Sequence, residues 1–152
     1  MILKVEDVMV EDVITVDSEA IVMEAVELMN KHEIGCLIVM RKGKAIGIVT
    51  ERDLLKRVLA KSRDPKKIKV RQIMSKPLIA GEPEMDVEDA ARFMFRRKIK
   101  KLPVVEGGSL IGLVTLTDLA RFQPQMIRML KKISARGLPP RRMKKVLDYY
   151  VV

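Results

Sequence analysis

Two turns of this chain repeat one pattern of glycine, two apolar residues, threonine, two further residues and aspartate. The pattern occurs at Gly47–Asp53 and again at Gly112–Asp118. A threonine followed three residues later by an acid is typical of a capping box, in which the hydroxyl accepts a backbone amide and the acid reaches back. Two features favour an additional role. A capping box needs no glycine upstream, and its usual acidic partner is Glu or Gln rather than Asp.

The same groups suit a ribonucleotide ligand. A carboxylate accepts hydrogen bonds from two hydroxyl donors, as the vicinal diol of a ribose provides. Free amides and positive potential at a helix N-terminus suit a phosphate, and the threonine hydroxyl adds a donor. Apolar strands upstream of each turn offer aliphatic surfaces for an adenine. We therefore expect a purine nucleoside with a charged end to bind at these turns.

The two turns belong to an internal repeat, which must position them. A shift of 65 residues aligns Val5–Arg57 with Val70–Phe122 without a gap. A unit of this size is marginal as a lone core, so we expect two units packed sheet against sheet around a pseudo-twofold axis. The expected division is a first repeat at 1–58, a linker at 59–69 that turns at Asp64-Pro65, a second repeat at 70–122 and a basic helical extension at 123–152.

Each copy predicts the order β-α-β-β-α, an α/β fold. Apolar residues recur at helical spacing over 22–29, and Ser18 is the expected N-cap of that helix. The second copy is expected to repeat every element, with its hairpin turn at 106–109. The expected elements of the first copy are a short strand at 14–16, the helix, strands at 36–40 and 45–49 around a turn at Gly43, and a last helix from Glu51 to about Leu59.

The tandem units, the two turns and the strand Leu102-Pro103-Val104-Val105 together resemble a tandem cystathionine-β-synthase (CBS) domain pair, or Bateman module, of the stand-alone prokaryotic type. The resemblance covers about Val5 to Phe122. It implies a cytoplasmic regulatory protein that binds AMP, ADP, ATP or S-adenosylmethionine in two clefts between the repeats. It also implies a homodimer shaped as a flat disc, a separate protein partner, no required cofactor and a sensor rather than an enzyme.

The resemblance assigns ligand-binding roles to matching positions in both repeats. The first site would comprise Ile14, Thr15, Val16, Gly35, Cys36, Leu37, Thr50, Arg52 and Asp53. The second would comprise Ile79, Ala80, Lys101, Leu102, Pro103, Thr115, Thr117 and Asp118.

The two sites are not equivalent in sequence. Ala80 stands where the first copy has Thr15, and Thr117 stands where it has Arg52, so one hydroxyl and one cation are lost. Lys101 or its neighbour Lys100 offers a replacement, unless both are solvated. We expect the sites to differ in affinity or preferred ligand. Arg52 favours a phosphorylated ligand over S-adenosylmethionine, although an exposed first-turn arginine needs no ligand.

Composition excludes several other functions. A single cysteine and a single histidine leave no internal disulfide, no zinc knuckle and no convincing nucleophile, and no catalytic residue or metal ligand is predicted. Aromatic residues make up 3%, which is too few for stacking on single-stranded nucleic acid. No apolar run reaches the length of a membrane span, and the early acidic residues do not fit a signal peptide. Scarce Asn and Gln beside abundant Lys, Arg and Glu predict a heat-adapted protein.

Charge is unevenly distributed along the chain. Residues 1–58 carry a net charge of −3, residues 59–122 of +6 and residues 123–152 of +7. The extension has two apolar helical stripes, one at Met126, Met129, Leu130 and Ile133 and one at Met143–Tyr150. Its apolar faces predict docking on this domain, on a dimer mate or on another protein. Its basic faces leave nucleic acid or acidic lipid as an alternative partner and a nucleic-acid-associated protein as the alternative function.

Overall fold

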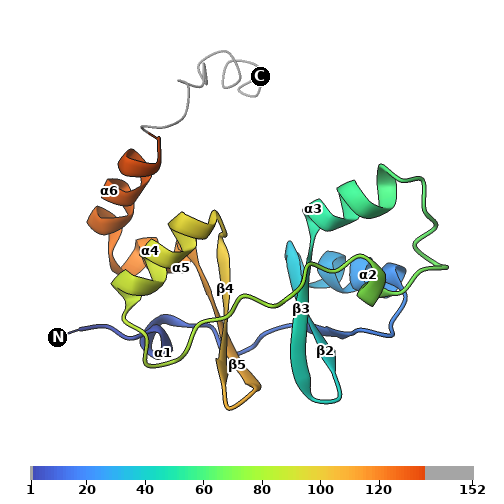
Figure 1. The fold of residues 1–152 in the computed structure, drawn as a ribbon, viewed down its shortest axis with the longest axis horizontal. Helices are drawn as coiled ribbons and strands as arrows, with labels where there is room; N and C mark the ends of the chain where they lie inside the picture. Colours follow the sequence, from blue (N-terminus) through green and yellow to red (C-terminus); the bar gives the residue numbers. More distant parts are fainter. Residues whose placement is uncertain (1, 136–152) are drawn as a thin grey trace.

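The computed structural model describes residues 2–135 and confirms a mixed α/β fold in two halves (Figure 1). The first half contains β1 (Thr15–Asp17), α2 (Val22–His32), β2 (Cys36–Arg41), β3 (Lys44–Thr50) and α3 (Glu51–Leu54), which continues as a π-helical turn over Leu55–Leu59. The second half contains α4 (Val87–Arg97), β4 (Lys101–Glu106), β5 (Ser109–Thr115) and α5 (Leu116–Phe122). The two repeats open with short helical turns at equivalent positions, α1 (Val5–Val8) and a 3-10 turn (Val70–Gln72), and α6 (Pro124–Ala135) follows the second repeat.

In each half, two long strands form an antiparallel hairpin. β2 pairs with β3 and β4 with β5, and β1 adds a parallel strand beside β2. Lys42 and Gly43 turn the first hairpin with φ of 49° and 76°, and positive φ at both central residues matches the twist of the strands. Figure 1 shows the two hairpins in the centre, with α2 and α3 outside one of them and α4 and α5 outside the other.

The second half lacks a full counterpart of β1, which corrects the expected order of elements. Gly81 makes only an isolated parallel bridge to Val104. Its backbone lies so close to β4 that a Cβ on Gly81 would sit 2.9 Å from Leu102 Cδ2. Glycine has little strand propensity, and only a single residue pair of the ladder forms here.

The segments that lead into the two halves are exchanged between them. Val5 and Val8 of α1 are buried in the core of the second half, whereas Val70 and Ile73, at the start of the second repeat, are buried in the core of the first. The hydrogen bonds follow the same exchange: the Val87 amide donates to Leu3 O at 3.0 Å, and the Val22 amide donates to Ile68 O at 2.9 Å. The two halves therefore share their cores through these crossing segments.

The crossing segments explain the repeated glycine of the two turns. A Cβ on Gly47 would lie 2.8 Å from Met74 Sδ and 2.9 Å from Ser75 O. A Cβ on Gly112 would collide with the side chain of Met9 and lie 3.1 Å from Val10 O. Since no side chain fits at either position, the glycines are required by packing, and their repetition is not evidence for a ligand.

Ser18 does not cap α2, and that expectation is wrong. The helix begins at Val22 with Ile21 as its N-cap, after a turn in which the Ala20 amide donates to Asp17 O at 3.1 Å. Linker carbonyls replace a side-chain cap, because the Val22 and Met23 amides donate to Ile68 O and Pro65 O. Ser18 is instead buried, with 1% of its surface exposed.

The extension helix α6 docks on this domain. Ile127 is buried in the second core at 3% exposure, and Met126 and Leu130 pack against the same core. Of the expected stripe, those two residues dock on this domain, whereas Met129 and Ile133 are 59% and 58% exposed. Figure 1 shows α6 beside α4 and α5. The second expected stripe lies outside the described residues. Between residues 2 and 135, the helices are too short or too polar to cross a bilayer.

Candidate functional site

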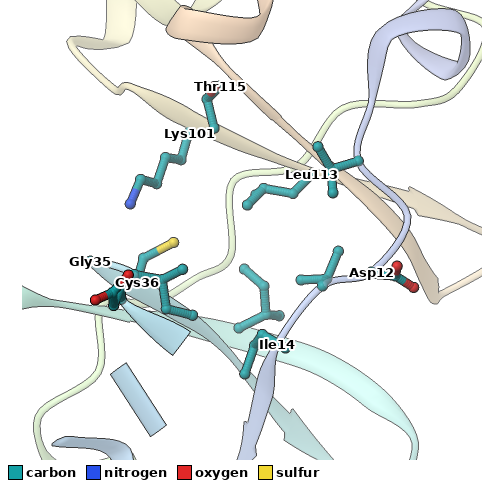
Figure 2. Close-up of a pocket in the computed structure, with 12 residues that line it drawn as sticks. Asp12, Ile14, Gly35, Cys36, Lys101, Leu113 and Thr115 are labelled. Carbon is teal, nitrogen blue, oxygen red and sulfur yellow. The ribbon is translucent and has the colours of Figure 1, made fainter. Parts of the chain in front are cut away.

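A cavity of about 350 Å³ lies between the two halves, beside the start of β2 and the end of β5. Its walls come from the segment before β1, from the start of β2, and from β4 and β5 of the other half (Figure 2). The apolar lining residues are Val10, Val13, Ile14, Ile34, Ile38 and Leu113, and the others are Asp12, Glu33, Gly35, Cys36, Lys101 and Thr115. The size and the mostly aliphatic lining fit a small organic ligand.

Five of the residues expected at ligand sites line this cavity. Ile14, Gly35 and Cys36 come from the expected first site, while Lys101 and Thr115 come from the expected second site. The structure thus combines the strand surface of one repeat with the turn of the other. The two halves meet at this cavity, where Cys36 of β2 and Lys101 of β4, which hold equivalent positions 65 residues apart, interact with each other.

The other expected residues are distributed among core and surface. Val16, Leu37 and Leu102 are buried within the hydrophobic cores, and Ile79 packs against the second core. Pro103 is also buried, and its carbonyl accepts a hydrogen bond from the Gly81 amide at 2.8 Å. The side chains that are exposed to solvent are those of Thr15, Ala80, Arg52 and Thr117. The last three expected residues, Thr50, Asp53 and Asp118, do not line the cavity and form part of the capping boxes at the two turns.

Lys101 and Cys36 meet inside the cavity. Figure 2 shows the Lys101 side chain extending across from β4 toward Cys36. Burial raises the pKa of the Cys36 thiol above its ordinary value, and the positive charge and hydrogen bond of Lys101 oppose that shift in part. Cys36 is therefore a protonated, weakly polar part of the wall at neutral pH and not a nucleophile.

The Thr115–Asp118 turn is a complete capping box. Asp118 Oδ2 accepts hydrogen bonds from the Thr115 amide at 3.1 Å and from Thr115 Oγ1 at 2.7 Å. Thr115 Oγ1 in turn accepts from the Asp118 amide at 3.1 Å. Every hydrogen bond that residues 2–135 make to the Asp118 side chain goes to Oδ2, so Oδ1 remains available as an acceptor.

This geometry corrects the expected role of the threonine. Its hydroxyl proton is directed at Asp118 Oδ2, so the hydroxyl does not add a donor for a phosphate. The Leu116 and Asp118 amides of the first turn are also bonded, to Lys100 O and Thr115 Oγ1. For the charged end of a ligand, Lys101 supplies a positive charge among the lining residues of the cavity.

The Thr50–Asp53 turn has the same capping box but a different environment. Asp53 Oδ2 accepts from the Thr50 amide at 3.0 Å and from Thr50 Oγ1 at 3.1 Å. Its other oxygen, Oδ1, accepts from Ser75 Oγ at 2.9 Å and lies 3.8 Å from Arg57 Nε. Asp53 is 6% exposed, so its carboxylate is both buried and fully bonded.

Several lining residues were missed by the sequence interpretation. Val10 and Leu113 form a bridge with two backbone hydrogen bonds of 2.9 Å, and both face the cavity. They meet because the N-terminal segment crosses to the second half. A signal existed in the repeat, since Val10 aligns with Ser75, but the alignment does not reveal which half either segment joins.

Comparison with known proteins agrees with this architecture. The chain matches the CBS domain family twice, at residues 5–60 and 70–124. It is 38% identical over 116 residues to the CBS domain-containing protein YhcV of Bacillus subtilis, covering 76% of this chain and 82% of that protein.

Two solved structures share the fold and have similar sequence identity to this chain. The CBS domain protein TA0289 of Thermoplasma acidophilum, whose function is unknown, matches with a TM-score of 0.78 and 30% identity over 90% of this chain and 78% of that chain. The CBS domain pair of protein MJ0100, solved with 5′-methylthioadenosine and S-adenosyl-L-methionine, matches with a TM-score of 0.72 and 31% identity over 80% of this chain and 96% of that chain. The chain therefore belongs to the CBS domain family and carries two such domains in tandem, the arrangement of a regulatory module.

Proposed function

We propose that this CBS domain pair senses an adenine nucleotide, AMP, ADP or ATP, in the cavity between its halves. The observation that carries the proposal is that an aliphatic surface and the Lys101 side chain line one cavity together with Thr115, the first residue of the turn in which Asp118 keeps a free carboxylate oxygen. The related MJ0100 pair is solved with two adenosyl compounds, which supports the choice of an adenosine ligand.

Each part of the nucleotide has a matching group. The aliphatic side chains of Ile14, Ile34 and Leu113 offer a dry surface for the adenine ring. Asp118 Oδ1, next to Thr115, accepts hydrogen bonds from the ribose hydroxyls. The Lys101 ammonium neutralises a phosphate, and a charge-assisted hydrogen bond of this kind is among the strong ones.

The cavity is lined by one cation, Lys101, and two carboxylates, Asp12 and Glu33, and we propose that Lys101 selects a phosphorylated ligand over S-adenosylmethionine, which carries a sulfonium cation. Lys101 extends into the cavity from β4, whereas the Asp12 carboxylate points away from Lys101 (Figure 2). A cation at the position of Lys101 repels a sulfonium and attracts a phosphate.

The signal can travel from the cavity to the extension by a short physical path. Thr115 is the N-cap of α5, and α5 packs against α6, whose Ile127 is buried in the same core. A ligand held by the Asp118 turn fixes the start of α5 and so biases the position of α6. We propose that this change regulates a partner protein, that the chain acts as a homodimer, and that it is not itself an enzyme.

Isothermal titration calorimetry tests the proposal. AMP, ADP, ATP, S-adenosylmethionine and NADH are titrated separately into the full chain. We expect binding of at least one of the three adenine nucleotides, tighter than that of S-adenosylmethionine. Absence of heat for all five compounds at millimolar concentration would refute the proposed function.

A further inference from the structure

The two turns differ in the residues that meet the aspartate. Ser75 donates to Asp53 Oδ1, whereas Val10 stands at the equivalent position in the other repeat. Arg57 brings its guanidinium to within 3.8 Å of the same oxygen, whereas Phe122 is its equivalent. The repeat therefore differs at both positions that approach the outer oxygen of Asp53.

Arg57 is held in place by the crossing segment. Its Nη1 donates to Ile73 O at 3.0 Å and to Met74 O at 2.8 Å, immediately before Ser75. One guanidinium thus joins the end of α3 to the segment that carries Ser75. Val10 and Phe122 have no side-chain donor, so the second repeat cannot form the same contacts.

We infer that Ser75 and Arg57 close the first turn to ligands, so that each chain binds one nucleotide, at the Asp118 turn. Ser75 and Arg57 act as specificity-determining residues: they occupy the carboxylate oxygen that a ribose would otherwise use. This inference rests on the proposed function and adds to it the number and location of the sites.

The burial and the hydrogen bonds of the two aspartates both favour binding at Asp118 over binding at Asp53. Asp53 is 6% exposed, and its two oxygens accept from Thr50 and Ser75. A ribose would have to displace the half-buried Ser75 from the buried Asp53 carboxylate and break their hydrogen bond. Asp118 is partly exposed and has a free Oδ1, so no protein hydrogen bond within residues 2–135 must break there.

The test exchanges the residues between the repeats. The opened variant carries Ser75→Val with Arg57→Phe, and the closed variant carries Val10→Ser with Phe122→Arg. AMP and ATP are titrated separately into the wild type, into both exchange variants and into Asp53→Asn and Asp118→Asn, with circular dichroism and thermal melting as the control for folding.

We expect a stoichiometry of one in the wild type and in Asp53→Asn, and loss of at least tenfold in affinity in Asp118→Asn. We expect two sites in the opened variant and weakened binding in the closed variant. A wild-type stoichiometry of two, with one site lost in Asp53→Asn, would overturn the inference and leave the proposed function intact.

A folded opened variant that still binds one nucleotide would also overturn the inference. If an exchange variant fails to fold, the two Asp→Asn variants decide, because they identify the turn that binds. Absence of binding to every protein refutes the proposed function, and the inference with it.

Discussion

The charge of Lys101 is expected to hold the phosphate of the nucleotide. Its ammonium extends into the cavity, whereas the neighbouring Lys100 is exposed on the surface. Lys101→Met keeps the aliphatic stem and removes the charge. Because a hydrogen bond to a charged group is worth about 1.5–3 kcal/mol, we expect affinity for ATP to fall roughly ten- to hundredfold by calorimetry. Lys100→Met is the matched control and should bind ATP like the wild type; an equal loss in both variants contradicts a specific role for Lys101.

Cys36 provides a pH-dependent reporter of the same cavity. Burial raises the pKa of its thiol above the ordinary value of 9.0, and Lys101 counteracts part of that rise. The reactive thiolate is therefore a minor species at pH 8, and the rate of reaction with a disulfide reagent should keep rising with pH through pH 9 without levelling off. Removing the Lys101 charge raises the pKa further, so Lys101→Met should react more slowly still. A rate that levels off below pH 8 in either protein would contradict the described environment.

At the scale of the elements, the repeated glycines Gly47 and Gly112 allow the crossing segments to pack closely against β3 and β5. Gly47→Ala places a methyl group 2.8 Å from Met74 Sδ and 2.9 Å from a backbone oxygen. Overpacking of this kind costs about 1–3 kcal/mol, which urea denaturation measures as a lower midpoint. The control is Gly107→Asn, because its φ of 58° lies in the left-handed region that Asn adopts and no atom of residues 2–135 other than its chain neighbours lies within 4 Å of the added Cβ; it should lower the midpoint less than Gly47→Ala. Equal stability of Gly47→Ala and the wild type would contradict the close approach.

The packing of α6 against the second core can be tested by two substitutions on that helix. Ile127→Ala removes a side chain that is 3% exposed in the second core, so the free energy of unfolding should fall by about 2–5 kcal/mol. Ile133→Ala, on the same helix at 58% exposure, should change it by less than about 0.5 kcal/mol. If the two variants lose the same amount, α6 does not rest on this domain as described.

Local patterns predicted most of the elements. The helical spacing of Val22 to Met29 and the apolar run after Gly35 correspond to α2 and β2. The two failures have different causes. Ser18 does not cap α2 because the carbonyls of Ile68 and Pro65 accept the amides of Val22 and Met23. The expected strand at Gly81 is reduced to a single bridge because glycine has little strand propensity.

The sequence predicted the types of residue in the candidate site, but it did not predict that residues of both repeats line one cavity. The motif and the resemblance indicated Thr115 and Lys101, and both line the cavity. They did not reveal that Ile14 of the first repeat shares that cavity, nor that Ser75 bonds to Asp53. Both facts depend on which half each entry segment joins, a property that a repeat alignment does not contain.

Across the whole molecule, the exchange of entry segments makes the two halves one cooperative unit. Val5 completes the second core and Val70 the first, so neither half has a full core without residues from beyond its own repeat. A ligand in the cavity contacts both halves and should stabilise the fold as a whole, by an amount that grows with the logarithm of the free ligand concentration above its Kd. This arrangement suits a regulatory module, since binding at one place affects every element that borders it.

A crystal structure of the full chain grown with saturating AMP tests the central claim most directly. The account predicts one AMP per chain, with its base against Ile14, its ribose at Asp118 and its phosphate at Lys101. The Asp53 turn should remain closed by Ser75. An empty cavity, or AMP held by Asp53 instead, would contradict the account.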